Sequence, residues 1–139
     1  MDSVFIDSDV CLDMLTDRRP FSLHAAKLFE MSGEGRILLF TSATSFTNLF
    51  YLLRKEVGSS KTAIQLLGRF KSLINVLPVT EKIIDAALSS DFSDFEDAVQ
   101  YFACIYGGVQ TIVTRNVKDY KTAGCAVLTP DAYLKAFNV

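Results

Sequence analysis

Short apolar segments alternate with segments of helical periodicity along the whole chain, and this alternation constrains the fold more than any other sequence feature. Five segments have the length and composition of buried strands: Ser3–Ile6, Ile37–Phe40, Asn75–Val79, Thr111–Val113 and Ala126–Leu128. Strands that alternate with helices pair in parallel, because each helix returns the chain to the starting edge of the sheet. The pattern predicts a three-layer α/β fold in which helices cover both faces of a central parallel sheet.

Residues that favour helix ends bound the segments between the expected strands. The pair Thr41-Ser42 and the residues Thr80 and Thr129 have the short hydroxyl side chains that cap helix N-termini, and Ser93 and Glu96 have the spacing of a capping box. The expected helices lie between Asp7 and Asp17, from Ser22 to Gly33 or Gly35, from Ser42 to Gly58, from Ser60 to Ser72, from Thr80 to Leu88, from Ser93 to Gly107, and after Thr129.

The composition is that of a globular protein with a single domain. The chain has 139 residues, of which 50% are apolar and 22% charged, so it can build one hydrophobic core but not two. Its apolar runs, such as Ile37–Phe40 and Leu49–Leu53, are much shorter than the ~20 residues of a membrane span. Residues 1–3 lack the positive charge that begins a signal peptide. We expect one domain over residues 1–139, in the cytoplasm.

Counts of charged, cysteine and histidine residues exclude several kinds of site. The 14 Lys and Arg residues against 16 Asp and Glu give a net charge of −2, so no overall positive field attracts nucleic acid. Cys11, Cys104 and Cys125 fit no zinc-binding or C-x-x-C spacing, and we expect buried free thiols. His24 alone cannot form a histidine-rich metal site or a Ser-His-Asp triad, and we expect it at the surface.

Acidic residues gather where the carboxyl ends of the expected strands meet. Asp7 directly follows three apolar residues, and Asp119 lies in the segment after the fourth strand. Asp94 and Asp97 lie on one face of the first turn of the sixth expected helix. Functional groups of open parallel sheets collect at this edge. A carboxylate cluster without histidine or thiol has the oxygen ligands that Mg²⁺ and Mn²⁺ prefer.

Several acids also have simpler interpretations. Glu96 has the position of the capping-box partner of Ser93. We expect three further acids to be mainly solvated or capping residues: Asp2, Asp9 and Asp13. Asp7 and Asp97 are different, because each adjoins apolar residues and a carboxylate is costly to bury unless a cation or a hydrogen-bond donor meets it.

Four segments follow one another in a recognisable order: Phe5–Val10; Thr41–Ser42 with the helix through Asn48 and Tyr51–Lys55; Asp94–Ala98; and Val113–Tyr120. In this order they resemble the PIN domain family, a metal-dependent nuclease fold that includes the VapC-type toxins of bacterial toxin–antitoxin modules. The resemblance covers essentially the whole chain. It implies a Mg²⁺- or Mn²⁺-dependent endoribonuclease in which Asp7 and Asp97 occupy the first and third acidic positions of the family.

The sequence departs from the family pattern at two acidic positions. Asn48 stands where the second acid, usually Glu, is expected, and Asn116 stands where the fourth is commonly Asp, with Asp119 as a substitute three residues later. An amide oxygen still binds a metal, but the lost charge lowers the affinity unless Asp94 or Asp9 restores it. The resemblance thus implies catalytic roles for Asp7, Asp97 and Asp119, and metal ligands at Asp7, Asp94, Asp97 and Asp119.

The resemblance also implies how such a site acts on RNA. The metal ions neutralise carboxylates that would otherwise repel one another, lower the pKa of a water for in-line attack on a phosphodiester, and stabilise the leaving oxygen. Three basic residues near the fourth segment and two at the end of the third expected helix form a local basic rim for phosphates: Arg115, Lys118, Lys121, Arg54 and Lys55. We predict four substrate contacts: Arg115, Lys118, Asn116 and Asn48.

Two alternatives remain open on the sequence alone. Phe5–Cys11 is also similar to the motif of haloacid-dehalogenase-like phosphatases, in which Asp7 would be a covalent nucleophile and Asp9 a general acid. Against it, the later acids open a helix instead of following a strand, and Cys11 stands where Thr or Val belongs. The other alternative is a non-catalytic PIN domain that binds RNA or protein, which the two asparagines would suit.

The third and fourth expected helices carry more large apolar side chains than one helix face usually buries: Phe46, Phe50, Tyr51, Ile64 and Phe70. We therefore predict a homodimer. The resemblance also implies an antitoxin protein as a partner, with a helix bound in a groove nearby.

Overall fold

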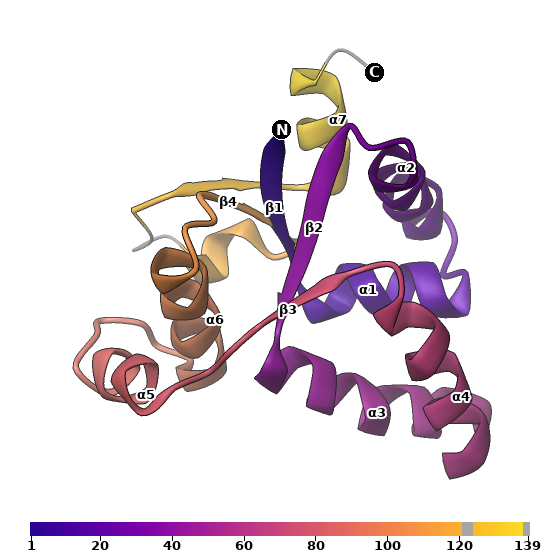
Figure 1. Cartoon of the computed structure of the whole chain (residues 1–139), viewed down its shortest axis with the longest axis horizontal. Helices are drawn as coiled ribbons and strands as arrows, with labels where there is room; N and C mark the ends of the chain where they lie inside the picture. Colours follow the sequence, from indigo (N-terminus) through magenta and orange to yellow (C-terminus); the bar gives the residue numbers. More distant parts are fainter. Residues whose placement is uncertain (121–123, 138–139) are drawn as a thin grey trace.

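The computed structural model describes residues 1–120 and 124–137. In this part of the chain five strands form one sheet in the order β3-β2-β1-β4-β5, and every neighbouring pair is parallel (Figure 1). The strands are β1 (Asp2–Ile6), β2 (Ile37–Ser42), β3 (Asn75–Leu77), β4 (Thr111–Val113) and β5 (Ala126–Leu128). The predicted parallel α/β architecture is confirmed.

Helices connect successive strands, and most begin and end where the sequence predicted. Ser42 and Thr80 cap their helices by accepting hydrogen bonds from the backbone N–H three residues on, and Gly58, with φ of 72°, ends the third helix in the left-handed conformation. The described helices are α1 (Ser8–Thr16), α2 (Phe21–Gly33), α3 (Ala43–Val57), α4 (Ser60–Lys71), α5 (Glu81–Leu88), α6 (Phe95–Tyr106), the 3₁₀-helix η1 (Val117–Tyr120) and α7 (Pro130–Ala136).

The start of α6 differs from the prediction by one residue. Its N-cap is Asp94, whose carboxylate accepts a hydrogen bond from the backbone N–H of Asp97 at 2.9 Å. Ser93 and Asp94 both have good capping side chains with an acid three residues later, so the sequence could not choose between them. The predicted capping box of Ser93 and Glu96 is therefore wrong.

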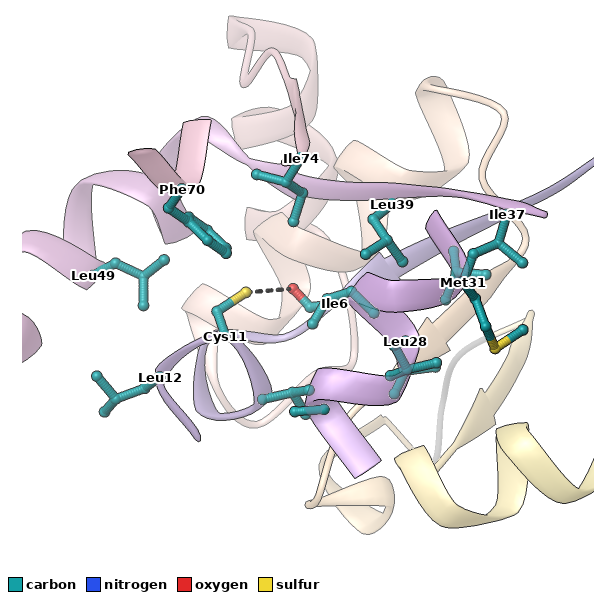
Figure 2. Packing of buried hydrophobic residues seen from close by; sticks show 14 of the residues in the cluster. Ile6, Cys11, Leu12, Leu28, Met31, Ile37, Leu39, Leu49, Phe70 and Ile74 are labelled. Atoms are coloured by element: carbon teal, nitrogen blue, oxygen red, sulfur yellow. Dashed lines mark hydrogen bonds between the residues drawn. The ribbon is translucent and has the colours of Figure 1, made fainter. Parts of the chain in front are cut away.

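Successive residues of each strand pack on opposite faces of the sheet. Val4 and Ile6 of β1 pack with helices α1 to α4 and α7, whereas Phe5 packs with α5 and α6. Figure 2 shows the larger cluster, in which the Sγ of Cys11 donates a hydrogen bond to the carbonyl oxygen of Ile6 at 3.7 Å. Helices thus cover both faces, as the sequence predicted. The side chains at the carboxyl edge of the sheet therefore start from a backbone that is packed on both faces.

The apolar side chains of α3 and α4 that were predicted to form a dimer surface are only partly exposed. Phe70 is fully buried and Phe46 and Phe50 pack against the same cluster, so these three residues do not contribute to the exposed apolar surface predicted for a dimer. Of the residues proposed for that surface, Tyr51 and Ile64 are exposed.

The third strand is shorter than predicted, whereas the cysteines lie nearly as predicted. β3 ends at Leu77, before the predicted end, where the following Pro78 has no backbone N–H to donate to a neighbouring strand. Cys11 and Cys104 are buried free thiols as predicted, and Cys125 is half-buried. In the described residues no helix combines the length and the apolar character that a membrane span requires.

Candidate active site

Asp7 is fixed at the carboxyl edge of the sheet by β1, α1 and the segment after β4. It follows the last residue of β1 in an extended conformation and caps α1, and its Oδ1 accepts a hydrogen bond from the backbone N–H of Ser8 at 2.7 Å. The hydroxyl of Thr114 donates to Asp7 Oδ2 at 2.8 Å. The backbone N–H of Asp7 donates to the carbonyl of Val113 at 3.0 Å. The carboxylate therefore has a single orientation set by rigid elements.

The hydroxyl of Tyr120 lies between the two central carboxylates. Its oxygen is 3.4 Å from Asp7 Oδ2 and 3.4 Å from Asp97 Oδ1, and it donates to Gln100 Oε1 at 2.8 Å. Gln100 in turn donates from Nε2 to Glu96 Oε1 at 3.2 Å. Because one O–H proton serves one acceptor at a time, Tyr120 links the two acids without compensating both charges.

Burial raises the pKa of Asp7. Loss of hydration is the main cause and the nearby charge of Asp9 adds to it, while hydrogen bonds from Thr114, Ser8 and Tyr120 act in the opposite direction. The net result is a pKa of about 6. A buried carboxylate with this pKa is poorly compensated by the chain alone.

The pKa of Asp97, on the first turn of α6, is raised further than that of Asp7. Burial is again the first cause, and its pKa rises to about 7. Four neighbouring acids add repulsion, in decreasing order Asp94, Asp7, Asp119 and Glu96. Three of the predicted site residues, Asp7, Asp94 and Asp119, thus lie near enough to Asp97 to raise its pKa, although Asp7 and Asp119 belong to other segments of the chain.

Asp9 and Asp13, predicted to be mainly solvated or capping residues, are instead held by the segment after β4. Asp9 Oδ2 accepts hydrogen bonds from the backbone N–H of Arg115 at 3.3 Å and from Asn116 Nδ2 at 3.1 Å. Asp13 is 1% exposed, and its Oδ2 lies 2.8 Å from Arg115 Nε. The prediction was wrong because Arg115 lies 102 residues further along the chain than Asp13.

Asn48 of α3 faces the site from another direction. It lines a pocket of about 300 Å³ together with Ser8, Tyr51, Leu52 and Glu96. Ser8 is the residue next to Asp7, so Asn48 approaches the first acidic position. Glu96 brings a carboxylate to the same pocket from α6.

The other predicted residues lie at the rim. Asp94 is exposed at the start of α6, and Asp119 is exposed on η1, near enough to raise the pKa of both Asp9 and Asp97. Lys118 is exposed on η1. Lys121 lies outside the described residues.

The donor chemistry fits a hard divalent cation. Two buried oxygens beside Asp7, Ser8 Oγ and Asp9 Oδ1, have no hydrogen-bond partner among residues 1–120 and 124–137. In the same described residues, no three His, Cys, Asp or Glu side chains converge as a complete ligand set. Mg²⁺ commonly binds through one or two carboxylates and keeps several waters, so a complete set of side chains is not required.

Four residues of this arrangement were not predicted to belong to the site: Ser8, Glu96, Gln100 and Tyr120. Glu96 was assigned to a cap that the structure does not form. Gln100 and Tyr120 are buried polar side chains whose partners come from separate elements, so nothing in the local sequence pairs them. The sequence did offer one usable indication: Thr114 directly follows β4, and parallel pairing of β4 with β1 places its hydroxyl beside the end of β1.

Comparison with known proteins agrees with this geometry. The family model of the PIN domain matches residues 3–118. The fold is similar to VapBC from Salmonella typhimurium bound to DNA, with a TM-score of 0.68, 13% identity, and coverage of 92% of this chain and 97% of that chain. It is similar to VapBC2 from Rickettsia felis bound to a DNA fragment from their promoter, with a TM-score of 0.66, 14% identity, and coverage of 91% and 96%.

A third similar structure is VapC20 from Mycobacterium tuberculosis, described as a Sarcin-Ricin loop cleaving toxin, with a TM-score of 0.63, 18% identity, and coverage of 78% of this chain and 86% of that chain. No curated protein matches the sequence significantly. At these identities the solved structures show the fold, and the family model accounts for most of the chain. The protein belongs to the PIN domain family.

Proposed function

We propose that this PIN domain is a divalent-metal-dependent endoribonuclease and acts as the toxin of a toxin–antitoxin pair. The observation that carries the proposal is the pair Asp7 and Asp97, which lie partly buried on either side of the Tyr120 hydroxyl and have pKa values of about 6 and 7. A cation stabilises such a pair in the ionised form, which the chain alone does not. Family membership favours this reading of Asp7 over a phosphatase nucleophile.

Asp7 and Asp97 are the proposed central ligands for Mg²⁺ or Mn²⁺, and Asp94, Asp119 and Asp9 add negative charge around them. A bound ion would activate water for attack on a phosphodiester and neutralise charge on the leaving oxygen. We assign the catalytic roles to Asp7, Asp97 and Asp119.

Other groups of the chain hold these acids in place. Thr114 and Ser8 orient the Asp7 carboxylate through hydrogen bonds to its two oxygens. Burial and the nearby acids raise the pKa of Tyr120 strongly, so its hydroxyl stays protonated and keeps donating to Gln100.

RNA contacts are proposed for Lys118, Asn116 and Asn48 at the rim of the site. Lys118 and Asn116 are exposed, so their side chains can reach phosphate and sugar oxygens. Arg115 has a different position from the one predicted, because Asp13 binds its guanidinium and reduces its charge toward phosphate.

The direct test is cleavage of total RNA by the purified protein with Mg²⁺ or Mn²⁺ and with EDTA. Cleavage with either metal and none with EDTA supports the proposal. Cleavage that persists in EDTA contradicts the metal dependence. RNA binding without any cleavage would favour the non-catalytic alternative, for which the specific observation is the pair of amides Asn48 and Asn116 in place of acids.

The Asn48→Glu variant is expected to bind Mn²⁺ about tenfold more tightly than the wild type, because a carboxylate is a stronger ligand than an amide. Asn48 shares a pocket with Ser8 and Glu96, so the added charge falls beside the proposed metal. Without metal the same charge repels Glu96, and the melting temperature should fall. Calorimetric titration measures the affinity, and Asn48→Gln is the matched control. Equal affinities in all three proteins would place residue 48 outside the metal site.

The proposed partners are an antitoxin protein and a second copy of this chain. Similar folds occur in structures named as VapBC complexes, which supports the antitoxin. The homodimer is supported by exposed apolar side chains on α3 and α4, the largest being Tyr51 and Ile64 at 57% and 60% exposure.

The wild type is expected to have twice the mass of one chain in light scattering at micromolar concentration. The double variant Tyr51→Glu with Ile64→Glu should have the mass of one chain, because it buries two charges in the proposed interface. Leu88→Glu, an exposed leucine of α5 on the other face of the sheet, is the control and should stay dimeric. A monomeric wild type would contradict the prediction.

A further inference from the structure

A second cavity lies beside the carboxylate cluster, on the other side of the segment that follows β4. Its volume is about 410 Å³, within the range of ligand-binding pockets. Residues from three parts of the chain line it: Pro20, Phe21 and His24 at the start of α2, Arg115 and Asn116 after β4, and residues 129–131 at the start of α7. None of the roles assigned above explains this cavity.

The cavity offers a flat aromatic surface. Phe21 is 44% exposed although it is the first residue of a helix whose other face is packed in the core. The guanidinium of Arg115 lies over the Phe21 ring, with Cζ 4.1 Å from the ring centroid. The rings of Pro20 and Pro130 also line the cavity. Planar aromatic and guanidinium groups are the surfaces on which single-stranded nucleic acids stack their bases.

The charges in the cavity are already paired. Arg115 Nε and Nη2 lie 2.8 and 3.2 Å from the two carboxylate oxygens of Asp13. His24 Nε2 lies 3.5 Å from Asp131 Oδ1. Arg115 and His24 thus each have an acid beside them, which disfavours a phosphate and favours a neutral ligand. The imidazole, the carboxylate and the amide of Asn116 still provide donors and acceptors for the polar edge of such a ligand.

The cavity and the proposed catalytic site share one structural segment. Thr114 donates to Asp7, while the next two residues, Arg115 and Asn116, contact Asp9 and also line the cavity. A chain of nucleotides bound at the carboxylates therefore has the cavity as its neighbour. We propose that this cavity binds a nucleobase of the RNA adjacent to the phosphodiester that is cleaved, stacked on Phe21. The choice of RNA as the ligand rests on the proposed function.

The test uses His24, the single histidine of the chain, as a reporter. Its imidazole resonances are followed by NMR at constant pH, in EDTA, while each of the four nucleoside 5′-monophosphates is added. Base stacking shifts these resonances upfield in a saturable manner with at least one nucleotide. Ribose 5-phosphate, which has the sugar and phosphate but no base, produces no comparable shift. N-acetylphenylalaninamide represents an aromatic peptide side chain, and it binds more weakly than the best nucleotide.

Variants of Phe21 test the stacking surface. Phe21→Ala and Phe21→Leu raise the Kd of the best nucleotide by about tenfold or more, whereas Phe21→Trp keeps the affinity. The leucine variant preserves apolar packing, so a loss in both variants is not a folding defect. Tyr106→Ala removes an exposed aromatic ring at the far end of α6 and leaves the titration unchanged.

Three results would overturn the proposal: no shift with any nucleotide, equal shifts with ribose 5-phosphate, or tighter binding of the peptide analogue. Because the titration uses no metal and no cleavable bond, it is independent of nuclease activity. If the protein cleaves RNA but binds no nucleotide in this cavity, only the proposed base pocket is contradicted. If the protein binds nucleotides in this cavity but cleaves no RNA, the proposed nuclease function is contradicted and the base pocket is not.

Discussion

Replacing Asp7 with asparagine is expected to reduce metal-dependent RNA cleavage by roughly 10³-fold, because the loss of one central ligand removes several kcal/mol of transition-state charge stabilisation. The fold should persist. Asparagine caps a helix as well as aspartate does, so the bond from the Ser8 N–H to the side chain is retained. The measurement is the initial rate of RNA cleavage in Mn²⁺, with the melting temperature of the same sample.

Asp2→Asn is the matched control for this variant. Asp2 lies at the other end of the same strand, where its carboxylate accepts a hydrogen bond from the hydroxyl of Tyr133 at 3.1 Å. The control should keep full activity. An Asp7→Asn variant with wild-type activity would exclude Asp7 as a ligand, and loss of activity in both variants would point to a general effect on β1.

The elements of the fold were predictable because each is specified locally. Short apolar runs mark the strands, and Ser42, Thr80 and Gly58 mark helix ends by the hydrogen bonds and the backbone conformation that those residue types allow. The alternation of strands and helices then determines a parallel sheet. Boundaries failed where two local solutions compete, as at Ser93 and Asp94, and where the expected strand ran past Pro78, as at the end of β3.

The site was predictable only in part, because burial and pairing depend on contacts between distant residues. Asp7 and Asp97 were identified from their apolar neighbours and from their place at an edge where parallel strands end. Asp13 has apolar neighbours as well, yet it is an ion-pair partner of Arg115 rather than a ligand. Nothing in the local sequence around Asp13 or Arg115 indicates that these two side chains form an ion pair.

Tyr120 illustrates the limit most clearly. It ends a 3₁₀-helix of four residues, which is too short to give a periodic pattern. Its hydroxyl meets side chains from β1 and α6, and these contacts exist only once the sheet has formed. The sequence singled out Asp7 and Asp97 as candidates, but it did not reveal the tyrosine hydroxyl that lies between them.

The same electrostatics predict that the metal-free protein loses stability as the pH rises. Asp7 and Asp97 have folded-state pKa values of about 6 and 7, above the ordinary value of 3.8. The folded state therefore binds more protons than the unfolded state between about pH 4 and pH 7, and its stability falls across that interval. Metal binding to the folded state opposes this loss.

The Asp7→Asn variant removes one of these groups, so in EDTA it is expected to melt at a higher temperature than the wild type above pH 7. The raised pKa corresponds to an upper limit of about 3 kcal/mol, and the weaker hydrogen bond from Thr114 offsets part of it, which leaves roughly 1–2 kcal/mol or about 3–6 °C. At pH 4 the difference should nearly vanish, since the wild-type carboxyl is then protonated. Saturating Mn²⁺ should reverse the order by stabilising the wild type alone.

Asp17→Asn provides a control with the opposite sign. A hydrogen bond from Ser22 and the nearby charge of Arg19 lower the pKa of Asp17, so its ionised form stabilises the folded state at neutral pH and this contribution is lost on acidification. Asp17→Asn should therefore melt below the wild type at pH 7 and approach it near pH 3, with no response to Mn²⁺. Melting curves of the three proteins from pH 3 to 8, with EDTA and with Mn²⁺, measure both slopes. An Asp7→Asn variant that melts below the wild type in EDTA at pH 8 would show that hydrogen bonding to Asp7 outweighs its desolvation, and that the site does not need a cation to be stable.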